Sequence, residues 1–540
     1  MTPRIPPKNG SVFAPGQVMR LEFPAQGYVN PLNTTLEFDV TLYGYTTSTY
    51  QTVRFQNSIS SIFSRVRLMY GATPLEDIIN YNVIVRALTN WTATKGDLDQ
   101  TSIAEGWGTV VWGSDALSAN SSAASTVATQ GLVNVRQKYI QGISSNNLNV
   151  NTAGTSSVAL QGVGFGSVPQ TADLPGGVTG NGTTPVTRRY QINFALGLFT
   201  QDKLIPTKFM ASQLAIEMTL EQSSACIYSP VINTTTGAPT YGVGNINLIP
   251  EILEFDASYD EMFLRGLTDG GVPIKFSSWH TFLFSSASSS NVNLQVQERS
   301  RSVKALFCVQ RRQTPLFGTD SHAFFFDTAS ASTTNSAAAS TLQNFQFRIG
   351  GRYFPASPVQ TSTNVGSANS NGGAEAYIEL AKALNIVGDY RLATSTNASN
   401  FAVCPGTVYN AGAVVSNGIA VLPEFDFTLG EIGQSSGGYP VYQIYEGTTN
   451  SFAGTSSSGT FAMATDLETS NGIEISGLNA EEQSDISLIA NWKLPQVTGS
   501  NGFVISGNTI VGSVPSSLEV YTFYDAMIVL KPNNVVELIQ

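Results

Sequence analysis

The sequence predicts an all-β protein made of two large domains, and three observations lead to this prediction. The chain has 540 residues, which is more than a single hydrophobic core usually serves. Charged residues make up only 12% of it, about half of the usual level of roughly 25%, while Gly, Ser, Thr, Asn and Gln are abundant. Segments in which apolar and polar residues alternate recur along the chain, and this period is typical of strands that bury one face.

In the first half, alternation predicts strands at 18–23, 35–43, 61–70, 189–199, 213–221 and 247–256, with a turn-rich segment at 24–33. The segment 75–90 is predicted to be a helix, because Pro74 precedes it and Glu76 and Asp77 suit the positive end of a helix dipole. A short helix is expected at 259–267.

Residues 113–187 form a long stretch dominated by Ser, Ala, Gly, Thr, Asn and Val. Such a stretch is uncommon inside a compact domain. We expect long loops with a few short strands that project from one end of the fold, and a disordered linker is the alternative.

The pattern begins again after Gly270 and Gly271. Strands are predicted at 272–276, 279–284, 292–298, 301–309, 343–349, 419–429, 459–467, 484–492 and 519–531, with a helix at 374–384. Both halves therefore share one plan, in which a strand runs into a glycine turn (Gly71, or Gly350 and Gly351), then a proline, and then the mid-domain helix.

This repeated plan favours a tandem pair of eight-stranded jelly rolls, with long loops and a few short helices. The irregular spacing of the strands argues against a solenoid or a propeller. We expect an extended N-terminal arm at 1–12, a first jelly roll at 13–268 that contains the loop region 113–187, and a second jelly roll at 269–540.

Charge and targeting signals exclude several functions. The formal net charge is -11 and no basic run exists, so we expect no sequence-specific nucleic-acid binding by the folded body. Arg4 and Lys8 lie among three prolines, which favours an extended arm over a helix. No signal peptide and no long apolar run is visible, so neither secretion nor a membrane span is expected.

No pattern of reactive residues predicts catalysis or a cofactor. The two histidines, His280 and His322, stand in a strand-like run and a polar loop, and no nucleophile elbow accompanies them. Residues 162–166 are glycine-rich but lack the Lys-Ser/Thr of a phosphate-binding loop. We therefore predict a non-enzymatic protein without catalytic residues or cofactors.

Metal and disulfide chemistry is equally unsupported. The three widely spaced cysteines, Cys226, Cys308 and Cys404, are expected to be small buried hydrophobic residues in a reducing compartment. A cluster of acidic residues suits a helix N-terminus better than a metal site, and four arginines suit either ion pairs between subunits or a solvated strand edge. These residues are Asp256, Asp260 and Glu261, and Arg299, Arg301, Arg311 and Arg312.

Several short segments resemble double jelly-roll major capsid proteins. The segment 13–28, followed by the Leu-x-Phe strand of 31–38, is similar to the start of that family. Further similar segments are 76–82, 197–206 with 214–217, 350–355 with 375–379, and 475–479. Their order along the chain carries the resemblance, which is greatest to capsid proteins of polinton-like viruses and virophages in the adenovirus-like and tailless-phage lineage.

The resemblance implies a structural protein of the virion capsid. Its jelly rolls would stand side by side, nearly normal to the shell, in a pseudo-hexagonal homotrimer. Trimers would tile an icosahedral shell around double-stranded DNA, in some members over an inner membrane, and contact penton and minor capsid proteins. Outer towers would map to 113–187, 320–341 and 391–416.

Two other classes of function stay open at this point. A viral fibre, spike or receptor-binding β protein would usually carry repeats or a coiled-coil shaft, and neither is visible. A carbohydrate-binding or hydrolytic β-sandwich is compatible with the 49 Gly and 20 Tyr. A protein of this class would require exposed aromatic platforms, a pair of acidic residues and a secretion signal.

Overall fold

The computed structural model describes a series of segments that together form the body of the molecule. They are residues 1–43, 45–46, 54–55, 58–93, 104–105, 112–115, 133–136, 181–182, 186–228, 240–285, 291–311, 341–361, 374–386, 414–415, 419–420, 461–468, 476–481, 485–493, 517–531 and 535–540.

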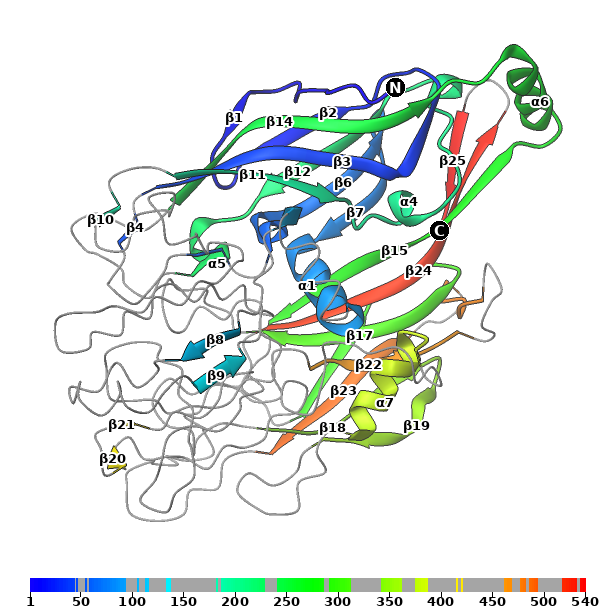
Figure 1. The fold of residues 1–540 in the computed structure, drawn as a ribbon. Helices are drawn as coiled ribbons and strands as arrows, with labels where there is room; N and C mark the ends of the chain where they lie inside the picture. The colour runs from blue at the N-terminus through cyan, green and yellow to red at the C-terminus, as the bar shows by residue number, and fades with distance from the viewer. Residues whose placement is uncertain are drawn as a thin grey trace.

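Eight strands of the first half form two packed four-stranded sheets (Figure 1). In chain order they are β1 (Val12–Phe13), β2 (Val18–Glu22), β3 (Tyr28–Tyr43), β6 (Phe63–Tyr70), β7 (Thr73–Ile79), β11 (Val186–Asn193), β12 (Leu214–Leu220) and β14 (Thr240–Leu253). One sheet has the order β1-β14-β3-β11 and the other β2-β12-β6-β7.

Eight strands of the second half repeat this arrangement. They are β15 (Val272–Ser285), β16 (Asn291–Val296), β17 (Val303–Arg311), β18 (Thr341–Ile349), β19 (Arg352–Gln360), β22 (Met463–Asp466), β23 (Ile486–Lys493) and β24 (Ser517–Lys531). Their sheets are β15-β24-β17-β22 and β16-β23-β18-β19, and a further strand, β25 (Val535–Ile539), pairs with the end of β24.

The two halves therefore share one strand order. If the eight strands of each half are numbered along the chain, one sheet reads 1-8-3-6 and the other 2-7-4-5 in both halves. All pairings are antiparallel, and two such sheets packed face to face make a jelly roll. The predicted fold, two tandem jelly rolls, is confirmed.

Short elements complete the described fold. The helices are α1 (Tyr81–Thr92), α4 (Gly197–Thr200), α5 (Ser223–Cys226), α6 (Ala257–Thr268) and α7 (Ala374–Ala383), with 3-10 turns at Ile59–Ile62 and Thr207–Phe209. Two-stranded pairs are formed by β4 (Tyr45–Thr46) with β10 (Asn181–Gly182), β5 (Arg54–Phe55) with β13 (Ile227–Tyr228), β8 (Trp112–Asp115) with β9 (Val133–Arg136), and β20 (Val414–Val415) with β21 (Ile419–Ala420). The helices predicted at 259–267 and 374–384 are confirmed as α6 and α7.

The predicted helix at 75–90 is wrong in its first part, where the chain forms strand β7. Gly71, with φ 58, turns the chain so tightly that Tyr70 pairs with Thr73, and β7 runs back along β6. Pro74 is tolerated because it lies near the start of an edge strand. The helix, α1, begins only after Asn80, whose φ of 54 breaks the strand.

Other boundaries also differ from the predictions. The strand predicted at 189–199 ends at Asn193, and Gly197–Thr200 form helix α4. The turn-rich segment 24–33 contains the start of β3, and 272–284 is one continuous strand. Strands β19 and β25 were not predicted. Most of 113–187, 320–341, 391–416 and 419–429 lies outside the described residues.

The N-terminal arm runs along the open edge of β14. Ile5 pairs with Leu248, and Val12 pairs with Gly244, so the arm is extended and antiparallel to β14. Between these points residues 6–11 leave the sheet. The prolines of the arm remove backbone donors from this edge, as do Pro355 and Pro358 in the edge strand β19.

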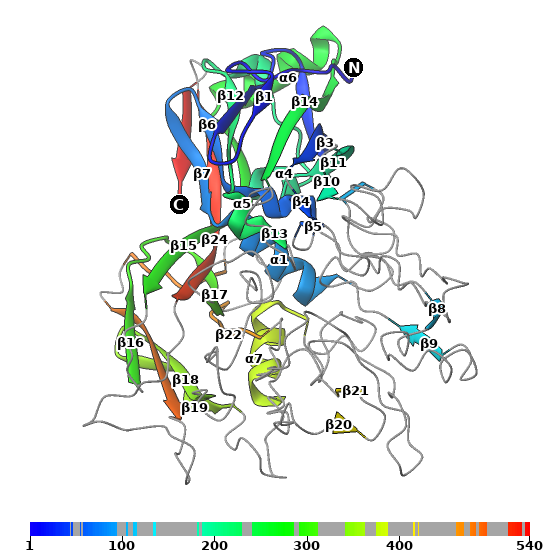
Figure 2. The ribbon, with the colours of Figure 1, turned by 90° about the vertical axis from the view of Figure 1, so that its left-hand side faces the viewer.

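The two sandwiches are packed against one another. Figure 2 shows α1 below the first sandwich and beside the strands β17 and β24 of the second. A single cluster of buried hydrophobic side chains includes residues of both sandwiches. Within it, the Trp91 ring of α1 stacks on Phe307 of β17, with ring centroids 5.3 Å apart.

Candidate functional site

The only described histidine holds a buried carboxylate rather than activating a nucleophile. His280 Nδ1 lies 3.1 Å from Glu298 Oε2, and the imidazole stacks on the Tyr524 ring at 4.1 Å. The Glu298 carboxylate also accepts hydrogen bonds from the backbone amide and hydroxyl of Ser300, at 2.9 and 2.7 Å, and from the Thr522 hydroxyl. His322 lies outside the described residues.

Glu298 is therefore a structural acid. Burial alone would raise its pKa, but the hydrogen bond and charge of His280, together with the hydroxyls of Thr522 and Ser300, outweigh burial and lower the pKa to about 2. The backbone amides and hydroxyl groups around this carboxylate all donate hydrogen bonds to it, which favours its ionised form.

Lowering the pH is expected to remove the contribution of the ionised Glu298 carboxylate to the free energy of unfolding. Its folded-state pKa lies below the ordinary value of 4.5, so its stabilisation is present above pH 4.5 and is lost as the pH falls toward 2. The loss is on the order of 3 kcal/mol, at ~1.4 kcal/mol for each pKa unit. Urea unfolding between pH 6 and pH 2 should show a shallower acid limb for Glu298→Gln than for the parent chain. Gln213→Ala, at an exposed position of the first sandwich, is a non-titrating control, and parallel curves for Glu298→Gln and parent would contradict the assignment.

The other residues considered for chemistry have structural partners. Cys226 and Cys308 are free and buried, and burial raises the pKa of both thiols. Asp256 caps α6 through the backbone amide of Tyr259, and Asp260 pairs with Lys208. Among the described residues no group of acidic, His or Cys side chains could hold a metal ion. Cys404 and residues 162–166 lie outside the described part.

The predicted ion pairs between subunits remain a prediction. Arg301 pairs with Glu481 of its own chain at 2.9 Å, and both side chains are more than half exposed. Arg311 ends β17, while Arg312 lies outside the described residues. An exposed pair of this kind contributes little to stability.

The junction between the sandwiches is centred on Glu76, a residue that the sequence wrongly placed in a helix. Its side chain, on β7, is 1% exposed. It accepts hydrogen bonds from the backbone amides of Gly197 and Leu198, at 2.7 and 2.8 Å, and from the hydroxyl of Ser278 on β15, at 2.6 Å. One carboxylate thus fixes α4 and β7 of the first sandwich to β15 of the second.

The surroundings of Glu76 close the junction. Burial raises the pKa of Glu76, and the hydrogen bonds from Ser278, Leu198 and Gly197 act in the opposite direction. The Thr281 hydroxyl donates to the carbonyl oxygen of Ile79 at 2.9 Å. A Cβ atom on Gly197 would lie 2.1 Å from the carbonyl oxygen of Ser277, so this contact requires a glycine.

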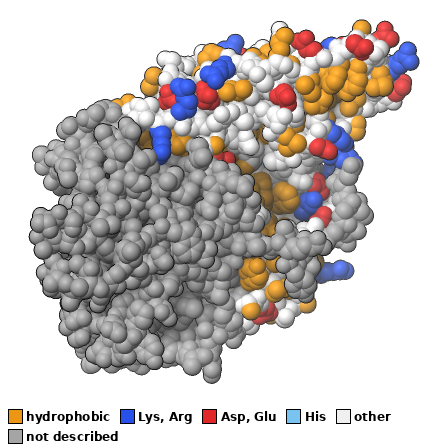
Figure 3. Space-filling model, in the orientation of Figure 1, with side chains coloured by type: hydrophobic (Ala, Val, Ile, Leu, Met, Phe, Trp, Pro, Cys, Tyr) orange, Lys and Arg blue, Asp and Glu red, His pale blue; other side chains and the backbone are white. Residues whose placement is uncertain are grey.

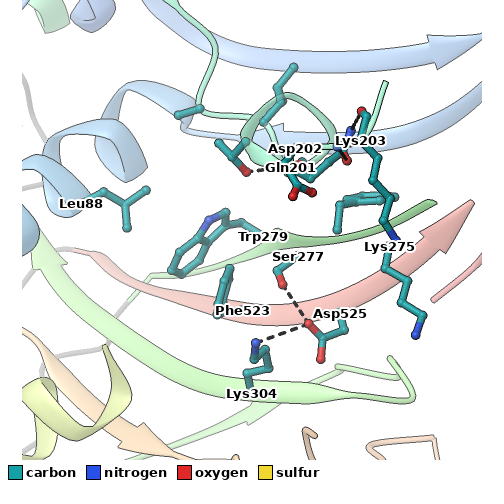
Figure 4. Close-up of a pocket in the computed structure, with 15 residues that line it drawn as sticks. Leu88, Gln201, Asp202, Lys203, Lys275, Ser277, Trp279, Lys304, Phe523 and Asp525 are labelled. Atoms are coloured by element: carbon teal, nitrogen blue, oxygen red, sulfur yellow. Dashed lines mark hydrogen bonds and ion pairs between the residues drawn. The ribbon is translucent and has the colours of Figure 1, made fainter. Parts of the chain in front are cut away.

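A groove of about 530 Å³ opens beside this junction and is lined by both sandwiches. Figure 4 shows Trp279 and Phe523 side by side on its floor, with ring centroids 4.6 Å apart. Asp525 accepts a hydrogen bond from the Ser277 hydroxyl at 2.8 Å and lies 3.6 Å from Lys304 Nζ. These polar groups have partners within the chain, and the groove holds no described arrangement for catalysis.

The corresponding outer sheet faces of the two sandwiches differ in charge. On β2, β12 and β6, Arg20 and Arg67 both pair with Glu217, at 2.9 and 2.7 Å, and Arg20 also pairs with Glu22. The face of β2, β12 and β6 therefore has the alternating ion pairs of a solvated sheet. Figure 3 shows the other side of this sandwich, over β14 and β3, where charges of both signs also lie side by side.

The equivalent face of the second sandwich consists mainly of amides. Asn291, Asn491 and Asn344 stand side by side on β16, β23 and β18, and Asn491 Nδ2 donates to Asn344 Oδ1 at 2.6 Å. The next row is Asn293, Ile489 and Gln346, and the row after it is Gln295, Ser487 and Arg348, the last paired with Asp485. Depletion of charge at this density is typical of the centre of a protein interface.

Comparisons with known proteins show the fold. No protein-family model and no curated protein sequence matches the chain. Among solved structures, the chain is similar to the Faustovirus major capsid protein, with a TM-score of 0.50 and 9% identity, over 98% of this chain and 90% of that chain. This likeness confirms a double jelly roll.

Two further solved structures are similar over almost the whole chain. A chain of the PBCV-1 virus capsid has a TM-score of 0.48 and 9% identity, covering 100% of this chain and 96% of that one. The mavirus major capsid protein also has a TM-score of 0.48 and 9% identity, covering 99% and 89%. Within the described part of the chain, no helix is long and apolar enough to cross a membrane.

Proposed function

We propose that this chain is a major capsid protein, a non-enzymatic building block that assembles with copies of itself into a virus shell. The observation that carries the proposal is the presence of two jelly rolls with one strand order, joined through a sealed junction into a single block. A block with two halves of one strand order places neighbours in two similar geometric positions, which suits a tiled surface.

The finer features of the proposal follow the resemblance in the sequence. The chain divides near residue 268 into two jelly rolls, preceded by the arm at 1–12. Three copies form a pseudo-hexagonal trimer, and trimers enclose double-stranded DNA within an icosahedral capsid. Penton and minor capsid proteins are further partners. A cyclic interface of this kind is head-to-tail and closes on itself.

The surface chemistry supports assembly over catalysis. The amide-covered face of β16, β23 and β18 resembles an interface in its lack of charge. The single described histidine and the two described cysteines serve packing and hydrogen bonding. No observation favours the fibre or the carbohydrate-binding alternative.

The purified chain should behave as a trimer. Light scattering coupled to size-exclusion chromatography is expected to give a mass near three chains, and negative-stain images should show particles with a hexagonal outline. Obligate subunit interfaces bury on the order of 2,000 Å² or more, so the trimer should persist on dilution to nanomolar concentration. A monomer at every concentration, or a monomer retained by immobilised glycans, would refute the capsid proposal.

A further inference from the structure

One edge of the first sandwich is covered by the second sandwich, while no described strand covers the equivalent edge of the second. Strand β7 packs against β15 through Glu76 and Ile79. Its counterpart β19 is the last strand of its sheet in the described part of the chain. The β19 side chain Tyr353 is 47% exposed.

The open edge carries aromatic and proline side chains where the covered edge carries the buried acid. Opposite Leu68 of β6 stands Glu76, whereas opposite Phe347 of β18 stands Phe354. Of the two neighbours of Phe354, Tyr353 is exposed and Pro355 is half-buried. The edge is thus suited to a contact through apolar side chains.

The first sandwich has a groove at the place where this edge would dock. Ser278 of the second sandwich donates a hydrogen bond to Glu76, and in the sheet it stands opposite Tyr524, in the middle of β24. The edge of β7 therefore docks beside the middle of β24. The middle of β14, the counterpart of β24, is residues 245–247. Here the arm leaves the sheet and forms a groove of about 690 Å³, lined by Arg4, Pro6, Pro7, Lys8, Gly10, Ser11, Glu37, Arg189 and Asn245–Asn247.

The charges of this arm groove are already paired within the chain. Arg4 lies 3.3 Å from Glu37, and Arg189 Nε lies 2.7 Å from Asp39 Oδ1. Lys8 pairs with Glu22 at 3.3 Å. A neutral side chain therefore fits the groove better than a charged one, and the rings of Pro6 and Pro7 offer an apolar wall.

We infer that the arm groove of one copy receives the β19 edge of a second copy, with Tyr353 as the anchoring side chain. The inference rests on the proposed function and names its intersubunit contact. In this contact, β19 of one copy would pack against the arm of the next copy in the way that β7 packs against β15 within one chain. Because prolines interrupt the backbone donors on both the arm and β19, the contact is made by side chains and not by a shared sheet.

The first test is the oligomeric state of Tyr353→Asp. A buried carboxylate without a partner is strongly unfavourable, so this variant should dissociate at a concentration at least ten times higher than the parent. Met262→Asp, on α6, is the matched control, because Met262 is 63% exposed and lies on neither surface. Circular dichroism and thermal unfolding establish that both variants are folded.

The second test is directional cross-linking between copies. Lys8→Cys and Tyr353→Cys are placed in separate chains that also carry Cys404→Ser, and the two chains are co-expressed with different tags, so that mixed trimers assemble before they are oxidised. Disulfide-linked dimers that contain one chain of each kind are expected. Lys8→Cys mixed with Met262→Cys is the control pair, and Cys226 and Cys308 are buried in all chains.

The outcomes separate this inference from the proposed function. If the Tyr353→Asp trimer is as stable as the Met262→Asp trimer, the docking of β19 in the arm groove is overturned. Cross-linking no greater than in the control pair overturns it as well. Either result leaves the capsid proposal intact. A parent chain that never forms a trimer overturns both.

Discussion

Replacing Glu76 with alanine is expected to lower the free energy of unfolding by about 2–6 kcal/mol. The change leaves the buried amides of Gly197 and Leu198 without their acceptor, and each unsatisfied buried donor costs roughly 1–3 kcal/mol. Urea unfolding followed by tryptophan fluorescence measures the loss. Hydrogen exchange of a peptide that spans 195–200 should accelerate, because these two amides become free to exchange.

Two further variants separate the loss of the acceptor from a general loss of stability. Glu76→Gln keeps one acceptor oxygen, so it should lose less stability than Glu76→Ala. Glu481→Gln removes an acid that is 55% exposed, and such changes usually stay within about 0.5 kcal/mol. If Glu76→Ala were as stable as Glu481→Gln, the carboxylate would not hold the junction together.

Adding a methyl group at Gly197 is expected to disrupt the junction from the same side. A Cβ atom there would meet the Ser277 carbonyl oxygen at 2.1 Å and the Ser277 carbonyl carbon at 2.8 Å. Neither is the end of a flexible side chain, so α4 and β15 must move apart. Overpacking of this kind costs typically 1–3 kcal/mol and occasionally more, and we expect Gly197→Ala to lie at or above the upper value.

Gly266→Ala provides the matched glycine control. Gly266 lies in helix α6, and its new Cβ would find Val272 at an ordinary 3.7 Å. Alanine is favoured over glycine inside a helix by about 0.5–1 kcal/mol, so this variant should gain stability where Gly197→Ala loses it. Equal unfolding midpoints for the two variants would show that Gly197 makes no close contact across the junction.

The strands were predictable wherever burial of one face sets the local pattern. In β18, Phe345, Phe347 and Ile349 point into the core and polar residues point out, so alternation marks the strand without knowledge of its partners. The repeated turn before the mid-domain helix was visible for a similar reason. Gly71 and Gly350 both have positive φ, a backbone conformation that glycine adopts at no steric cost.

The junction was not predictable, because its signals are ambiguous locally. An acid two residues after a proline suits the first turn of a helix, and it equally suits an edge strand whose acid meets amides from a distant segment. Glu76 lies in an edge strand because Gly197, Leu198 and Ser278 supply hydrogen-bond donors to its carboxylate. The strand was likewise predicted to run on to residue 199, because Leu196 and Leu198 continue the alternation. Both side chains are buried, but Leu196 immediately precedes α4 and Leu198 lies within it.

The prolines on the arm and on β19 affect the state of the chain before assembly. A polypeptide with so many strands, made at high concentration, is at risk of stacking open edges into cross-β fibres. Pro3, Pro6 and Pro7 on one edge, and Pro355 and Pro358 on another, deny an incoming strand its row of backbone partners. The prolines therefore protect both edges against pairing with a strand of another copy, while contacts through side chains remain available at these edges.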